Sequence, residues 1–136
     1  MTVGTDSWVT LTEANTYLGN KFGAATWSPL SNSIKEQLLI SAFMAIYYSK
    51  EYTVSKTSTS EFVKSAQIET AWYIYNYNTE SEKRGALQAQ GVDSFSLSKF
   101  SETYNGNYSM IPPIAKGMLE GFSSWDVFAT FERELD

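Results

Sequence analysis

The chain carries its clearest helical pattern in residues 34–46, which read IKEQLLISAFMAI. Apolar residues recur there at the spacing of one face of an α-helix. Two N-terminal caps fit the pattern: Ser31, or Ser33 within the capping box Ser33–Glu36. The helix is expected to end near Tyr48, because the Ser/Thr-rich residues that follow disfavour helix. The predicted buried face consists of Ile34, Leu38, Ala42, Ala45 and Ile46, widened by Leu39 and Phe43.

Toward the N-terminus, residues 1–9 are expected to be extended, with 7–9 a short strand or an anchored arm. Thr10 and Glu13 have the spacing of a capping box, in which each side chain bonds the backbone N–H of the other residue. A helix is predicted from there to about Phe22, ended by Gly23. Its predicted face consists of Leu11, Ala14, Leu18 and Phe22.

Toward the C-terminus, residues 58–61 offer another capping box, and a third helix is predicted to run to about Tyr77. Residues 80–85 are expected to be a charged connector. The predicted helix face consists of Phe62, Val63, Ala66, Thr70, Ile74 and Tyr77.

The last part of the chain changes character after Gly85. Residues 91–104 alternate with a period of two and predict a β-hairpin that turns at 98–99. Pro113 suits the first turn of a short helix, with Ile114, Met118 and Phe122 in register. The sequence therefore predicts a mostly α fold: a small bundle of three to four helices with a β-hairpin, over residues 1–122, and an extended C-terminal arm, residues 123–136.

Composition narrows the possible functions. The chain has a net charge of -5 and no cluster of Lys and Arg, so it is a poor candidate for a protein that mainly binds nucleic-acid phosphates. It has no Cys and no His, which removes thiolate nucleophiles, Ser-His-Asp triads and imidazole or thiolate metal sites. It also has no Gly-rich phosphate loop. We expect no enzyme activity, no catalytic or metal-binding residue and no cofactor.

No membrane association is expected either. The first residues lack the charged and apolar regions of a signal peptide. No apolar run approaches the roughly 20 residues that span a bilayer.

Five stretches, in this order, resemble tailed-phage head–tail connector proteins, also called adaptor or head-completion proteins. They are DSWVTLTEANTYL (6–18), KEQLLISA (35–42), VKSAQIETA (63–71), GVDSFSLSKFSETY (91–104) and IPPIAKGML (111–119). The resemblance implies a structural protein of the virion, made in the host cytoplasm and placed at the head–tail interface. Copies would form a dodecameric ring that joins the portal protein to the tail-side neck or terminator protein. DNA would pass through its lumen during ejection without being bound sequence-specifically.

Two groups of apolar residues are assigned to these contacts. The hairpin side chains Phe95, Leu97, Phe100 and Tyr104 would meet a neighbouring subunit or a tail protein. The portal-binding arm would use Trp125, Val127, Phe128, Phe131 and Leu135.

Members of the family are also often described as DnaT-like single-stranded-DNA-binding proteins, which is the alternative function. For that role, the aromatic residues 72–77 would be a base-stacking platform. The other interpretations of these residues are a subunit interface and plain core packing.

The spacing of the arm residues leaves a second possibility. Phe128, Phe131 and Leu135 are three and four residues apart, so they also suit one face of a last helix on the protein's own core. The apolar side chains lie in a net-acidic segment after Ser123 and Ser124, and such segments often become ordered only on binding. This favours the arm.

Overall fold

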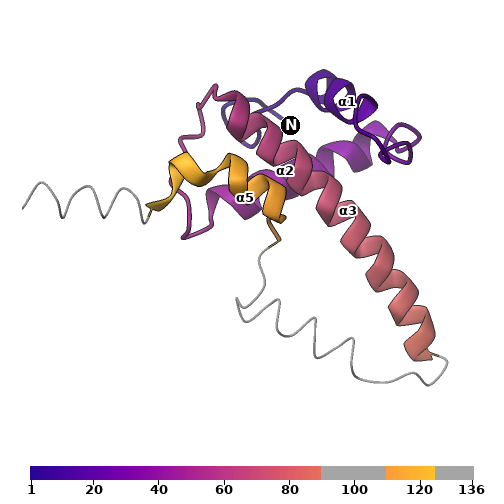
Figure 1. Ribbon diagram of the computed structural model, residues 1–136. Helices are drawn as coiled ribbons and strands as arrows, with labels where there is room; N and C mark the ends of the chain where they lie inside the picture. Colours follow the sequence, from indigo (N-terminus) through magenta and orange to yellow (C-terminus); the bar gives the residue numbers. More distant parts are fainter. Residues whose placement is uncertain (90–109, 125–136) are drawn as a thin grey trace, which may run out of the picture.

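In the computed structural model, residues 1–89 and 110–124 are described, with side chains for 1–78 and 110–124. The order of elements is α1 (Leu11–Gly19), α2 (Asn32–Tyr47), α3 (Glu61–Ala89), α5 (Pro113–Met118) and a 3-10 turn, η1 (Glu120–Phe122). The mostly helical fold is confirmed. In Figure 1, α3 runs diagonally through the body, with α1 and α5 on opposite sides of it and α2 crossing behind.

Within those ranges there is no strand, only the isolated bridges Val3–Ser7 and Tyr52–Ser123. The hairpin predicted over 91–104 lies outside the described residues, so the structure gives it no support.

The capping box of α1 is confirmed. The Thr10 hydroxyl accepts from the Glu13 N–H, and the Glu13 carboxylate accepts from the Thr10 N–H, both at 3.1 Å. The predicted end at Phe22 is wrong. The helix ends at Gly19, the chain turns through Gly23 at φ +84°, and Phe22 is fully exposed. A glycine accepts this left-handed conformation without a steric penalty.

In α2, Ser31 is the cap: its hydroxyl accepts from the Ile34 N–H at 3.3 Å. The predicted face is only partly right, since Ile34 is exposed and Lys35 is buried. Apolar residues surround almost the whole of this helix, so their spacing did not decide which side faces the core. The buried residues are Lys35, Leu39, Ala42, Phe43 and Ile46.

α3 starts and ends later than predicted. The Lys64 N–H donates to the Ser60 carbonyl, which places the cap at Ser60 rather than Ser58. The helix continues through the predicted connector 80–85 to Ala89. Residues 80–89 are mostly Glu, Lys, Arg, Ala, Leu and Gln, which favour helix. Phe62, predicted to be buried, is exposed.

The core forms two clusters, and α3 contributes buried residues to both. One contains Val9, Leu18, Trp27, Leu39 and Ile68; the other contains Trp8, Phe43, Val63 and Leu119. Trp8 is fully buried, and its ring centroid lies 4.4 Å from that of Phe43. Residues 7–9 are therefore an anchored segment and not a paired strand.

α5 begins at Pro113 and is short, as predicted. Its register differs from the prediction, because Ala115 and Leu119 are buried while Ile114 is exposed.

A buried hydroxyl in α3 provides a test of the packing. Thr70 is fully buried, and its Oγ1 has no hydrogen-bond partner among the described residues. Because an unpaired buried polar group costs about 1–3 kcal/mol, Thr70→Val should raise the free energy of unfolding by about 1 kcal/mol. Thr70→Ser, which keeps the hydroxyl and loses the methyl group, should lower it. Urea denaturation of both variants measures this, and a less stable valine variant would show that the hydroxyl is paired.

Candidate functional site

None of the residues assigned to the hairpin contact or to the portal-binding arm lies in the described part of the chain. Phe95, Leu97, Phe100 and Tyr104 fall within 90–109. Trp125, Val127, Phe128, Phe131 and Leu135 fall within 125–136. Their assignments stay predictions.

The structure does fix the point where the chain enters the predicted arm. The Thr53 N–H donates to the Phe122 carbonyl at 2.8 Å, and the Ser124 N–H donates to the Glu51 carbonyl at 2.9 Å. The hydroxyls of Thr53 and Ser124 are 2.8 Å apart. Residues 123–124, the first two of the predicted arm, are thus bridged to residues 51–53, which anchors the chain before Trp125.

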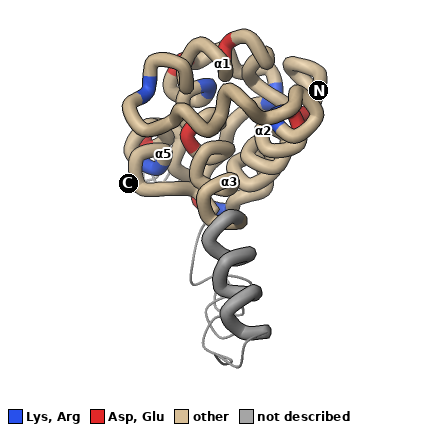
Figure 2. Tube along the Cα trace, turned by 90° about the vertical axis from the view of Figure 1, so that its right-hand side faces the viewer, with Lys and Arg blue, Asp and Glu red and all other residues tan. Residues whose placement is uncertain are grey.

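The aromatic stretch of α3 is half-buried and pairs within itself. Trp72 stacks with Tyr75 at 5.8 Å between centroids, and Tyr73 stacks with Tyr77 at 6.2 Å. Trp72 also packs against the core cluster around Leu18 and Trp27. Figure 2 shows the Lys and Arg positions spread over the body among acidic ones rather than gathered as in a basic groove. A base-stacking platform normally requires such a basic groove.

The described side chains, those of residues 1–78 and 110–124, include no group of three or more Asp or Glu placed as a metal site would require. None of the helices described there combines the length and hydropathy needed to span a bilayer.

One buried charge pair joins the loop after α1 to α3. Lys21 forms an ion pair with Glu69, whose side chain is 2% exposed. The Tyr17 hydroxyl bonds to the same carboxylate, and burial together with the Glu69 charge raises the pKa of Tyr17 above its ordinary value. The pairing follows no local sequence pattern, because the two charges are 48 positions apart.

A second ion pair reinforces the start of α1. The Lys64 ammonium lies 3.1 Å from the Glu13 carboxylate. Partial burial raises the pKa of Glu13, but the hydrogen bonds from Thr10 and Lys64 have the larger effect. Together they lower the pKa of the Glu13 carboxyl below its ordinary value of 4.5.

This arrangement predicts a pH-dependent contribution to stability. Glu13→Gln keeps the capping hydrogen bond and removes the charge. The pKa of the Glu13 carboxyl is lower in the folded state than in the unfolded state. Its charge therefore stabilises the fold at pH values above the unfolded-state pKa, and this stabilisation is lost as the pH falls through the folded-state pKa. The wild type should therefore be more stable than the variant at neutral pH, and the difference should disappear at strongly acidic pH. Unfolding curves of both proteins from about pH 2 to pH 7 test this; a pH-independent difference would contradict it.

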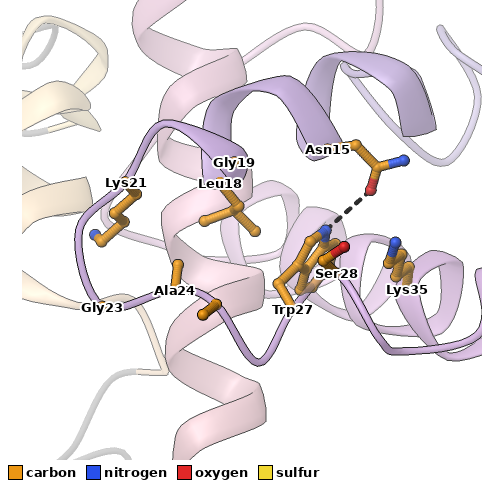
Figure 3. A pocket seen from close by; sticks show the side chains of 10 residues that line it. Asn15, Leu18, Gly19, Lys21, Gly23, Ala24, Trp27, Ser28 and Lys35 are labelled. Carbon is orange, nitrogen blue, oxygen red and sulfur yellow. Dashed lines mark hydrogen bonds between the residues drawn. The ribbon is translucent and has the colours of Figure 1, made fainter.

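A hollow lies between α1, the loop that follows it and the start of α2 (Figure 3). It has a volume of about 550 Å³. The Trp27 indole forms one wall, and its Nε1–H donates to the Asn15 Oδ1 at 3.0 Å. Lys35 lies at the same wall, with its ammonium 5.8 Å from the Trp27 ring centroid. The sequence pattern gave no sign of this hollow, because Lys35 was not among the residues of the predicted buried face.

Comparison with models of protein families, with curated proteins and with solved structures finds no match to this chain.

Proposed function

We propose that this protein is a structural head–tail adaptor of a tailed bacteriophage, which forms a ring that joins the portal to the tail or neck and lines the DNA exit channel. The order of five sequence stretches that resemble connector proteins supports the proposal, as does the mostly helical body. The observation that carries it furthest is the projection of α3, which extends beyond every other described element (Figure 1).

A projecting helix needs something to pack against. Ile74 is the last buried residue among the described side chains of α3, yet the helix continues to Ala89, roughly 22 Å further at about 1.5 Å per residue. Short helices are marginal in water without tertiary packing. In a ring, the neighbouring copy supplies that packing, with the half-buried Tyr73 and Tyr77 at the base of the projection.

The predicted hairpin 91–104 directly follows this projection. Its apolar side chains Phe95, Leu97, Phe100 and Tyr104 would contact the neighbouring subunit or a tail-side protein. The part of the arm from Trp125 onward, which follows the anchored Ser124, would dock into the portal. An acidic chain with a net charge of -5 suits a channel through which DNA slides without being held.

Light scattering after size exclusion tests the adaptor role. The purified chain is run alone, with a portal protein of the same phage, and with a single-stranded oligonucleotide at low salt. Joining the portal in a defined multiple supports the adaptor. A chain that ignores the portal and shifts with the oligonucleotide in a salt-sensitive way would replace the proposal with single-stranded-DNA binding.

The arm has its own test. Replacing Phe128 and Phe131 by alanine should weaken portal attachment by tenfold or more, because burying one Phe at a surface contributes about 1.5–3 kcal/mol. Phe22→Ala is the matched control, since Phe22 is fully exposed on the body. Pull-down with immobilised portal protein measures attachment, and thermal unfolding confirms that each variant is folded. If the double variant binds as well as the control, the arm does not hold the portal.

A further inference from the structure

The side of α2 that faces away from the core is apolar. Ile34, Met44 and the C-cap residue Tyr48 are 45%, 50% and 67% exposed. At 3.6 residues per turn they fall within about 80° of the helix surface, opposite the buried residues of the helix. The two charged residues of α2, Lys35 and Glu36, lie outside this arc. The solvent side of a helix normally carries charged and polar residues, so the α2 face, defined by Ile34, Met44 and Tyr48, indicates a docking surface.

The anchor at residues 123–124 sets the direction in which the chain leaves the body. Ser123 and Tyr52 form an antiparallel bridge, and the Ser124 N–H donates to the Glu51 carbonyl at 2.9 Å. Because the two segments run in opposite directions, the pairing directs the chain at Ser124 toward the C-terminal end of α2. Figure 1 shows the end of the described chain beside the segment that follows α2. Residues 125–136 therefore start next to the α2 face.

Residues 125–136 match the α2 face in spacing and in length. Their large apolar residues recur at intervals of three, three and four, which suits one face of a helix. These residues are Trp125, Phe128, Phe131 and Leu135. At 1.5 Å per residue, a helix of residues 125–136 measures about 18 Å, and the distance along α2 from Ile34 to Tyr48 is about 21 Å. Burying each phenylalanine on such a face contributes about 1.5–3 kcal/mol.

We propose that the α2 face binds residues 125–136 of the same chain, antiparallel to α2, with Trp125 near Tyr48 and Leu135 toward Ile34. The chain's own segment is the occupant because the anchor holds it beside the face, and a short connection gives an effective concentration on the order of millimolar. A second copy reaches that concentration only in a very concentrated solution.

This contact does not rest on the adaptor role, because it forms within one chain and needs no other protein. If the adaptor role holds, the arm leaves the α2 face before it docks into the portal, because the same apolar side chains serve both contacts. The contact then keeps these side chains out of water until the portal is reached.

The Met44 methyl resonance of the full chain, assigned through Met44→Leu, reports on the contact. Phe128→Ala combined with Phe131→Ala should move this resonance, because aromatic rings shift the resonances of methyl groups that they contact. Phe22→Ala is the matched control and should leave it in place, since Phe22 is fully exposed in the loop after α1. A Met44 resonance that stays unmoved in the double variant would show that residues 125–136 do not cover the α2 face.

Trypsin cleavage after Arg133 tests the same contact from the side of α2. Met44→Ser combined with Tyr48→Ser should accelerate this cleavage by about tenfold, because proteolysis follows the population of the released segment. Phe62→Ser is the matched control, since Phe62 is 66% exposed and lies on α3. Intact mass measures the loss of residues 134–136, and thermal unfolding verifies that each variant folds. Cleavage of the double variant at the wild-type rate would overturn the proposal.

Dilution separates the chain's own segment from that of a second copy. The wild-type cleavage rate should stay constant when the protein is diluted about a hundredfold, because a contact within one chain does not depend on concentration. Cleavage that accelerates on dilution would overturn the proposal and assign the α2 face to residues 125–136 of a second copy. Portal protein is absent from these assays, so their outcome is independent of the adaptor role.

Discussion

Gln67→Ala is expected to lower the free energy of unfolding by about 3–5 kcal/mol. Gln67 is fully buried in α3 and makes three hydrogen bonds to two other segments. Its Oε1 accepts from the Trp8 N–H at 2.8 Å, and its Nε2 donates to the Ser7 hydroxyl and the Leu39 carbonyl, both at 2.9 Å. The alanine leaves a cavity and strands these buried groups, so the cavity and desolvation penalties add.

Matched variants separate the two penalties. Gln67→Met fills nearly the same space without the hydrogen bonds, and should recover the cavity contribution only. Gln37→Ala, at an exposed position of α2, should change stability by less than about 0.5 kcal/mol. Urea denaturation gives the free energies, and amide exchange at Trp8 reports whether residues 7–9 are released. An alanine variant as stable as Gln37→Ala would show that the Gln67 network does not hold the N-terminal segment.

Gln67 also illustrates what the sequence could and could not predict. The helices, their order, the cap at Thr10 and the start of α5 at Pro113 follow from local signals, because helix starts depend on residues that are close together in the chain. A glutamine on the buried face of a helix gives no such signal. Its partners, Ser7, Trp8 and Leu39, are brought to it only by the fold.

The predictions of which helix faces are buried were partly wrong for a related reason. In α2 and α5, apolar residues such as Ile34 and Ile114 occupy more than one side of the helix, and tertiary packing decides which side is buried. The structure buries Lys35 and leaves Ile34 exposed, and the Lys35 ammonium lies over the Trp27 ring, 5.8 Å from its centroid. Lys35 and Trp27 both line the hollow, so the hollow could not be predicted without the loop that carries Trp27.

The predicted C-terminal end of α3 was also wrong. The charged residues 80–85 were assigned to a connector, although most of them favour helix. Continuation of the helix to Ala89 turns the supposed connector into the projection on which the ring proposal depends.

The charge pair between Lys21 and Glu69 gives the second large prediction. Lys21→Met should lower the free energy of unfolding by about 2–3 kcal/mol, because it leaves the buried Glu69 carboxylate with only the Tyr17 hydroxyl as a partner. Breaking a fully buried pair costs roughly 3–5 kcal/mol. The Lys21 side chain is 29% exposed, so water reaches the site and reduces the loss.

A double-mutant cycle distinguishes this cost from lost packing. Lys21→Met combined with Glu69→Gln removes both charges and keeps the volume, and should be more stable than Lys21→Met alone. Lys50→Met serves as the exposed control. Chemical denaturation at neutral pH measures all four proteins of the cycle and the control. If the double variant is no more stable than Lys21→Met, the loss lies in the packing of the lysine stem, and the bridge between the loop and α3 is held by contacts other than charge.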